Sequence, residues 1–391
     1  MLGFKIKNLL AARIGLVVFL WAVCGLFFTG SAAAADLQIK GQSCVLIDAQ
    51  TGELLYAQNP DLKWYPASVT KIMTLVLALE AVEDGRLKLD EMVYTSKEAA
   101  GMGGSQVYLF EGEKRTLEEM LIAVAVGSGN DASYAVAEFI GGSYGEFIRM
   151  MNEKAKMLGM NGTNFVNPHG LHDKEHYTTA ADLAKLAFYA LKLPRFLDYT
   201  AIYEYQFRAD PKPLVLWNTN RLLKWYDGVD GMKTGYTGEA KYNLVTTAKR
   251  GSLRLISVVM GVPERNGHFT ESMKLLNYGF NQYEYVPVYP KDEVLGIAHV
   301  EHGKTDSVGL MTGGEVGVLQ KRGDKTEITA RVICRDNLAA PIAKGQQIGE
   351  LILLKDGKEL SRFAVVAAEA VERGNLVVTI RKLFRHISLR L

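Results

Sequence analysis

The sequence predicts an α+β protein in which an antiparallel sheet carries an inserted helical region and is followed by a small all-β domain. Strand-like segments stand near both ends of residues 36–286, and helical patterns separate them. After about Pro287, short β-like runs divided by turn signals replace this pattern. The chain of 391 residues, with 48% hydrophobic and 23% charged residues, has the composition of a folded protein of two or three domains.

Residues 1–35 have the pattern of a secretory signal peptide. Three basic residues precede an almost wholly apolar stretch, 14–28, and the alanines at 33–35 provide a cleavage site before Asp36. An uncleaved membrane anchor is the alternative. Removal of this segment changes the formal net charge from +2 to −1. A nearly neutral mature chain gives no reason to expect nucleic-acid binding.

Two cysteines remain in the mature chain, Cys44 and Cys334. Each lies in an apolar, strand-like run, and the two are far apart in the sequence. We therefore expect two buried free thiols and no disulfide bond.

The sheet of the first domain, residues 36–286, is predicted from two hairpins. The first places strands 42–48 and 53–58 around Gln50-Thr51-Gly52, and the second places strands 242–249 and 253–262 around a Gly-containing turn. Because the hairpins stand at opposite ends of the domain, the sheet is completed late in the chain.

The helical region between the hairpins is predicted from capping patterns. A serine or threonine followed three residues later by an acidic residue is typical of a helix N-terminus. Such pairs occur at Thr116 and Glu119, Ser143 and Glu146, and Thr179 and Asp182. A further helix is expected at about 271–277, after the second hairpin.

The second domain, residues 287–372, is predicted to be a small β-sandwich. Its expected strands are 294–300, 315–320, 327–334, 348–354 and 360–368, the last following an Asp356-Gly357 turn.

The final segment, residues 373–391, is predicted to form an amphipathic helix. Apolar residues recur at helical spacing from Leu376 to Leu391, four basic residues lie off that stripe, and residues 375–391 contain no acid. This pattern favours an interfacial anchor on a membrane surface, and a helix docked on its own protein is the alternative.

The first chemical signal is Ser68 followed by Lys71 at the start of an apolar helix, residues 72–81, just after Pro66. Residues three apart face the same way on a helix, so Lys71 can reach the Ser68 hydroxyl. A serine needs a base to become a nucleophile, and lysine can be that base only when it is neutral. Burial and the positive helix N-terminus both lower a lysine pKa.

Two further motifs add groups of matching chemistry. Ser128 and Asn130 follow the helix that ends near Val126, in a loop that should expose both side chains. There, the hydroxyl could relay a proton and the amide could bind a substrate carbonyl. Lys233, Thr234 and Gly235 precede the second hairpin. They offer a cation, a hydroxyl and a closely approachable backbone to an extended peptide and its carboxylate.

Taken together, S-x-x-K, S-x-N and K-T-G in this order resemble the signature of the penicillin-recognising serine enzymes. The segment around Ser68, the Asn167-Pro168-His169-Gly170-Leu171 run and the layout of the whole chain are similar to those of low-molecular-mass penicillin-binding proteins. The resemblance implies a D-Ala-D-Ala carboxypeptidase that acts on peptidoglycan stem peptides, is acylated by β-lactam antibiotics, and lies on the extracytoplasmic face of the cell membrane. It implies no cofactor and no metal.

The resemblance also implies a role for each motif residue. Ser68 would be the acylated nucleophile, Lys71 the proton acceptor and Ser128 part of the proton relay, and Asn130 would position substrate. Lys233 and Thr234 would bind the terminal carboxylate beside Gly235, and the backbone N–H groups of Ser68 and Tyr236 would form the oxyanion hole. The family often has an arginine where this chain has His268, with Arg265 nearby, so the second carboxylate contact differs here.

Several alternatives share parts of this pattern. A class A β-lactamase has the same three motifs but needs a deacylating carboxylate, typically in Glu-x-x-Leu-Asn, and no such segment lies between Asn130 and Lys233. D,D-endopeptidase activity and a non-catalytic wall-binding role remain alternatives. His169, His172 and His176 have spacings seen in zinc sites, but a structured loop beside the cleft is favoured.

Overall fold

The computed structural model describes residues 37–210 and 212–375. The predicted signal peptide and residues 376–391 of the predicted terminal helix lie outside the described residues. Within the part of the chain that is described, no helix combines the length and apolar character needed to cross a membrane.

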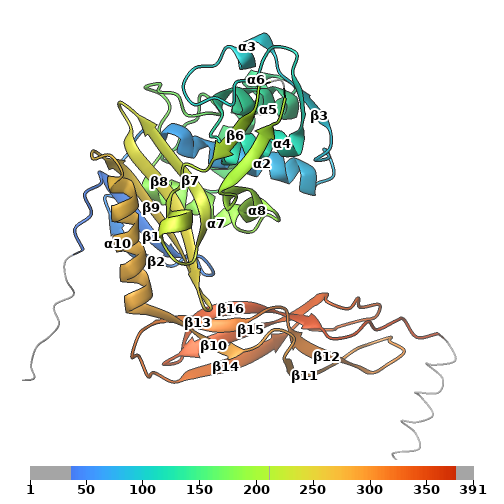
Figure 1. The fold of residues 1–391 in the computed structure, drawn as a ribbon. Helices are drawn as coiled ribbons and strands as arrows, with labels where there is room; N and C mark the ends of the chain where they lie inside the picture. Colours follow the sequence, from blue (N-terminus) through green and yellow to red (C-terminus); the bar gives the residue numbers. More distant parts are fainter. Residues whose placement is uncertain (1–36, 211, 376–391) are drawn as a thin grey trace, which may run out of the picture. The chain divides into compact units, whose positions relative to one another are not determined.

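A five-stranded antiparallel sheet forms the centre of the first domain, with the strand order β2-β1-β9-β8-β7 (Figure 1). Its strands are β1 (Ser43–Asp48), β2 (Leu54–Gln58), β7 (Val229–Thr237), β8 (Lys241–Arg250) and β9 (Leu253–Val262). Cys44 in β1 pairs with Val259 in β9. The first hairpin therefore pairs with a strand that lies more than two hundred residues further along the chain. This confirms the prediction of a sheet completed late in the chain, and it leaves β7 at an edge.

The sheet is apolar on both faces because helices cover each one. Val45 and Ile47 of β1 belong to the core beneath the helical region, whereas Leu46 faces the helix α10 (Gly267–Gln282). A Cβ on Gly279 of α10 would lie 2.5 Å from a methyl group of Leu255. The absence of a side chain there lets α10 pack closely on the sheet, along the face seen in Figure 1.

The inserted helical region surrounds one central helix, α2 (Lys71–Glu83), which is buried on nearly all sides and contacts α4, α5, α6 and α7. A helix that is apolar all round is expected in such a position. The other helical elements are η1 (Ala67–Thr70), α3 (Lys97–Ala100), α4 (Leu117–Ala125), α5 (Asn130–Gly141), α6 (Tyr144–Met157), α7 (Ala180–Ala190), α8 (Phe196–Thr200) and α9 (Leu222–Trp225).

The capping patterns correctly located three helix starts. Thr116 and Glu119 form a reciprocal capping box at α4, and the hydroxyl groups of Ser143 and Thr179 accept from backbone N–H groups at α6 and α7. The helix expected at 271–277 was predicted too short, because α10 begins at Gly267 and continues to Gln282.

Two short antiparallel strand pairs were not predicted. They are β3 (Met92–Tyr94) with β4 (Lys114–Thr116), and β5 (Glu204–Arg208) with β6 (Leu214–Trp217). Strands of three to five residues give too little alternation to be recognised in a sequence. The second pair is a hairpin, and its strand β6 ends at Trp217, which lines the candidate site described below.

The second domain contains only strands, as predicted. Its five-stranded sheet has the order β11-β12-β16-β15-β14, and β10 pairs with β13 in a second sheet. The strands are β10 (Tyr283–Tyr289), β11 (Val294–His299), β12 (Ser307–Thr312), β13 (Val316–Lys321), β14 (Ile328–Cys334), β15 (Gln347–Lys355) and β16 (Lys358–Ala367). β12 was not predicted, and the expected domain boundary at 286/287 falls within β10.

The described end of the chain continues the β domain. Arg373 forms an isolated antiparallel bridge with Gly303, and residues 373–375 are not helical. The prediction of a helix beginning at residue 373 is therefore wrong for its first three residues. Cys44 and Cys334 are free thiols, as expected, although Cys334 is only half-buried.

Candidate active site

Ser68 lies in a single 3-10 turn, η1, that leads directly into α2. Two glycines allow neighbouring segments to pack against this turn. A Cβ on Gly170 would lie 1.8 Å from the carbonyl oxygen of Ala67, and one on Gly235 would lie 2.7 Å from that of Pro66. The serine is consequently held between the loop that contains Gly170 and the edge strand β7, and its side chain lines a cavity of about 580 Å³.

Lys71 is fully buried at the first position of α2, and its Nζ atom contacts three groups. It lies 3.0 Å from Ser68 Oγ, and it donates to Asn130 Oδ1 at 2.7 Å and to the carbonyl oxygen of His169 at 2.6 Å. Burial lowers the pKa of Lys71 well below its usual value. Repulsion from Lys233 lowers it further, against a smaller opposing effect of Asp131. The base predicted from the sequence is therefore in contact with the predicted nucleophile.

Ser128 lies in the loop between α4 and α5, and Asn130 is the first residue of α5, but the exposure expected for both side chains is wrong. Both side chains are 3% exposed. Residues 103–105, before α4, bind Asn130: its backbone N–H donates to Ser105 O, and its Nδ2 donates to Gly103 O, both at 2.7 Å. Ser128 has a positive φ of 56° and still reaches the cavity that Ser68 lines.

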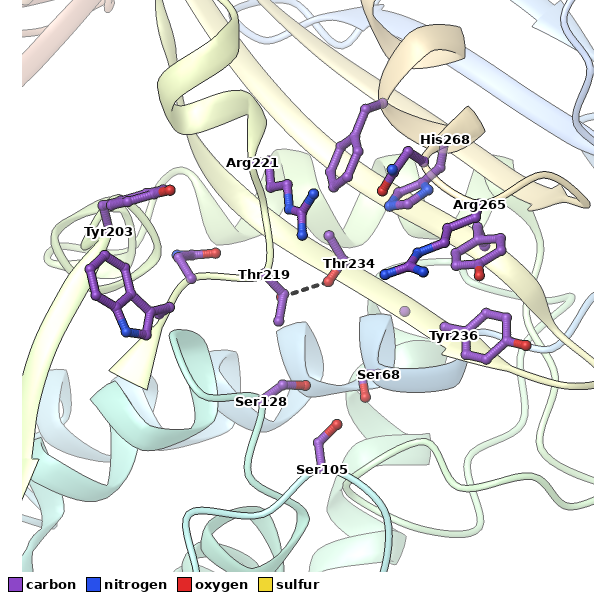
Figure 2. A pocket seen from close by; sticks show the side chains of 16 residues that line it. Ser68, Ser105, Ser128, Tyr203, Thr219, Arg221, Thr234, Tyr236, Arg265 and His268 are labelled. Carbon is purple, nitrogen blue, oxygen red and sulfur yellow. Dashed lines mark hydrogen bonds between the residues drawn. The ribbon is translucent and has the colours of Figure 1, made fainter. Parts of the chain in front are cut away.

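Lys233, Thr234, Gly235 and Tyr236 are consecutive residues of the edge strand β7, so the K-T-G motif lies within a strand. Lys233 is buried, and this burial lowers the pKa of its ammonium group to about 7. Thr234 lines the cavity and donates to Thr219 Oγ1 at 2.6 Å, a contact drawn in Figure 2. Because β7 is paired only with β8, its outer edge is open to an extended peptide.

His268 lies in the first turn of α10 and also lines the cavity, but it does so as a stacked ring. Its imidazole lies parallel to Tyr242 at 5.2 Å, and Tyr242 stacks on Tyr236 at 4.4 Å. Burial, and to a lesser extent the nearby Arg221 charge, lower the pKa of His268 to about 4. The ring is therefore neutral at pH 7 and brings no positive charge to the cavity.

Some lining residues were not found from the sequence. They are Ser105, Tyr203, Asn218, Thr219, Arg221, Asn266 and Phe269. Trp217 stands at the rim with 56% of its surface exposed and makes an edge contact with Tyr203. Figure 2 shows Arg221 and Arg265 reaching into the cavity. None of these residues belongs to a motif; separate loops, a short hairpin and the first turn of α10 bring them together.

The three histidines of the 169–176 loop have protein partners. His176 Nδ1 accepts from the N–H of Val166 at 3.0 Å, and its Nε2 lies 2.8 Å from Thr70 Oγ1. His169 Nδ1 accepts from the N–H of Leu171, and His172 makes an edge contact with Tyr65. Within residues 37–210 and 212–375, no group of three potential ligands is arranged for a metal ion.

This geometry agrees with comparisons to known proteins. A family model described as D-alanyl-D-alanine carboxypeptidase (Peptidase S11) matches residues 29–264, and one described as the C-terminal domain of penicillin-binding protein 5 matches residues 283–373. The chain is 41% identical to the Bacillus subtilis D-alanyl-D-alanine carboxypeptidase DacF, over 96% of this chain and 97% of that protein.

Other relatives show the same relationship. The Escherichia coli D-alanyl-D-alanine carboxypeptidase DacC is 34% identical over 89% of both chains. The crystal structure of penicillin-binding protein 5 from Haemophilus influenzae aligns with a TM-score of 0.68 and 34% identity, over 86% of this chain and 98% of that one. The family match covers more than half of the chain, and the chain therefore belongs to the D-alanyl-D-alanine carboxypeptidase family, peptidase S11.

Proposed function

We propose that this carboxypeptidase removes the terminal D-alanine of peptidoglycan stem peptides through an acyl-enzyme on Ser68. The contact between Lys71 Nζ and Ser68 Oγ at 3.0 Å, in a buried setting that favours a neutral amine, carries this proposal. A neutral amine has two N–H bonds, and the oxygens of Asn130 and His169 accept both. Its lone pair is then left for the proton of Ser68.

The reaction follows from this arrangement. Ser68 Oγ gives its proton to Lys71 and attacks the carbonyl carbon of the penultimate D-alanine. The backbone N–H groups of Ser68 and Tyr236 stabilise the resulting oxyanion. The peptide C–N bond breaks as Ser128 passes a proton from Lys71 to the leaving nitrogen, and the terminal D-alanine departs. Water then attacks the ester, with Lys71 again as base, and Ser68 is regenerated.

Substrate binding uses the open edge of β7. Thr234 contacts the terminal carboxylate, and the ammonium group of Lys233 beneath the strand supplies positive charge. Asn130 positions the peptide carbonyl and holds Lys71. Gly235 lets the peptide backbone come close to the strand.

β-Lactams should acylate the same serine. The penicillin-binding protein D2 of Listeria monocytogenes, whose structure is known in an ampicillin-bound form, is 32% identical over 63% of this chain. The 164–167 segment offers amides in place of the lactamase carboxylate: Asn167 Oδ1 accepts from Gly170 N–H, and Asn164 Nδ2 donates to Glu175 O. A penicilloyl-enzyme should therefore persist, which disfavours the β-lactamase alternative.

We further propose that the mature enzyme begins near Asp36, is secreted, and is held at the extracytoplasmic membrane surface by residues 376–391. The apolar stretch near the N-terminus and the basic amphipathic pattern at the C-terminus support this placement.

The decisive experiment uses the purified soluble chain, residues 36–375, and a diacetyl-L-Lys-D-Ala-D-Ala peptide. The wild type should release D-alanine and become covalently labelled by fluorescent penicillin, whereas Ser68→Ala should do neither while keeping its folded stability. A cross-linked dimeric peptide tested in parallel measures endopeptidase activity. A folded wild type that releases no D-alanine and takes no label would contradict the proposal.

A further inference from the structure

The cavity in front of Ser68 is positively charged and has no acidic lining. Among the described residues that line it, none is an aspartate or glutamate, and two are arginines, Arg221 and Arg265. Neither arginine has a carboxylate within salt-bridge distance in the described part of the chain. Lys71 and Lys233 are buried below the cavity floor, so the two guanidinium groups are the permanent charges that face a bound peptide.

The two arginines approach from different sides of Thr234. Arg221 lies two residues after Thr219, whose hydroxyl group contacts that of Thr234. The positive charge of Arg221 also lowers the pKa of His268. Arg265 comes from the loop between β9 and α10, and Figure 2 shows it on the Tyr236 side of Thr234. A peptide with its carboxylate at Thr234 and its reacting carbonyl at Tyr236 runs antiparallel to β7. The residues before the reacting carbonyl then extend past Tyr236, toward Arg265.

One terminal carboxylate can neutralise only one of these charges. Arg221, beside Thr234, is placed to pair with it, and the neutral His268 cannot compete for this role. Arg265 is left without an anionic partner on the side where the third residue of the stem peptide enters. A guanidinium fork binds a carboxylate well and repels an ammonium group.

We propose that Arg265 forms a second anion subsite and that the preferred substrate is a stem peptide whose third residue ends in a carboxylate. This inference rests on the proposed function, and it names the substrate class of the same site. A third residue that ends in a free amine is disfavoured, because its ammonium group would face Arg265 without an acidic neighbour in the lining.

Three acetylated peptides, X-D-Ala-D-Ala, test this with side chains of similar length at X. Aminopimelic acid ends in a carboxylate, ε-acetyl-lysine is neutral, and lysine ends in an ammonium group. For the wild type at low ionic strength, we expect kcat/KM to be about tenfold higher for the aminopimelyl peptide than for the neutral one, and lowest for the lysyl peptide. Added salt should narrow the difference.

Variants separate the roles of the cations. Arg265→Gln should abolish the preference while retaining activity on the neutral peptide, and Arg265→Lys should restore part of it. Arg221→Gln should lower kcat/KM for all three peptides alike. Lys224→Gln removes a cation that lies over the Tyr203 ring outside the cavity lining, and it should leave the preference unchanged.

The outcomes distinguish this inference from the proposed function. D-alanine release from all three peptides at similar rates, or an equal loss for all three in Arg265→Gln, would overturn the second subsite and leave the carboxypeptidase reaction intact. A preference that is lost in Arg221→Gln but kept in Arg265→Gln would also overturn it. Release from none of the peptides by folded enzyme would overturn both.

Discussion

Lys71 and Lys233 are both buried lysines of the same site, yet the tasks proposed for them require opposite protonation states. Lys71 must be neutral to accept the Ser68 proton, and its pKa is lowered by burial and by the charge of Lys233. Lys233 must be protonated to attract a carboxylate, and its pKa of about 7 reflects burial alone. An arriving carboxylate stabilises the ammonium form of Lys233, which raises its pKa, and the charged Lys233 in turn keeps Lys71 neutral.

This coupling predicts a difference between two pH profiles. The free enzyme governs kcat/KM, so this quantity should fall above about pH 7, where Lys233 loses its proton. The enzyme–substrate complex governs kcat, and its alkaline limb should lie at higher pH because bound carboxylate raises the pKa of Lys233. Steady-state kinetics between pH 5 and 10 would measure both. Coincident alkaline limbs would show that Lys233 does not contact the carboxylate.

At the scale of elements, the site depends on how closely β7 approaches the turn that carries Ser68. Gly235 has room for no side chain, because a Cβ would lie 2.7 Å from Pro66 O and 3.0 Å from Ser68 N. The strand could accommodate an alanine only by moving away from the nucleophile. The Tyr236 N–H would move with it, and this would displace one donor of the proposed oxyanion hole.

Gly235→Ala should therefore lower kcat/KM by about a hundredfold, the loss expected when reacting groups are displaced by about 1 Å. Gly238→Ala is the matched control, since a Cβ there would meet no atom within 4 Å. D-alanine release and the rate of penicillin acylation measure the effect. Equal activity in the two variants would show that the close approach of β7 is not required.

The loop of residues 163–178 also packs against the segment that contains Ser68. His176 in this loop makes a hydrogen bond to Thr70 of that segment. Its Nδ1 accepts from Val166 N–H, so the neutral ring carries its proton on Nε2 and donates to Thr70. Burial lowers the pKa of His176 to about 4. Between about pH 6.5 and 4 the unfolded chain binds this proton and the folded chain does not, so the free energy of unfolding falls as pH falls through this window.

His176→Gln tests this contribution, because an amide can make similar hydrogen bonds without titrating. From pH 7 to pH 4.5, the wild type should lose on the order of 2 kcal/mol more of its free energy of unfolding than the variant. Urea unfolding at the two pH values measures the difference. His169 and His268 also have lowered pKa values, and they are present in both proteins, so their effect cancels. An identical loss in the two proteins would contradict the prediction.

At the scale of the whole molecule, catalysis and membrane attachment should be separable. The proposed catalytic groups all lie in the first domain, whereas the basic amphipathic pattern lies in residues 376–391, after the β domain. The β domain has its own apolar core, built from both of its sheets, which is consistent with an independent structural unit.

Truncation after Asn375 should therefore abolish binding to anionic lipid vesicles and leave D-alanine release within about twofold of the longer chain. Co-sedimentation of residues 36–391 and 36–375 with vesicles makes the comparison. Replacing the four basic residues of the segment with glutamine should weaken binding and reduce its salt dependence. Vesicle binding that survives truncation would place the attachment elsewhere.

The sequence alone determined the features that are encoded locally. The Ser68–Lys71 spacing is set by helix geometry, the three helix starts by capping residues, and the β1–β2 and β8–β9 hairpins by turns between apolar runs. The order of the three motifs was enough to indicate the family. Only the tertiary structure decided that Ser128 and Asn130 are buried, that Lys233 lies within a strand, and that Arg221 and Arg265 share one cavity. The burial of a side chain and the charges near it depend on segments that are far apart in the chain. A local sequence pattern therefore cannot predict them.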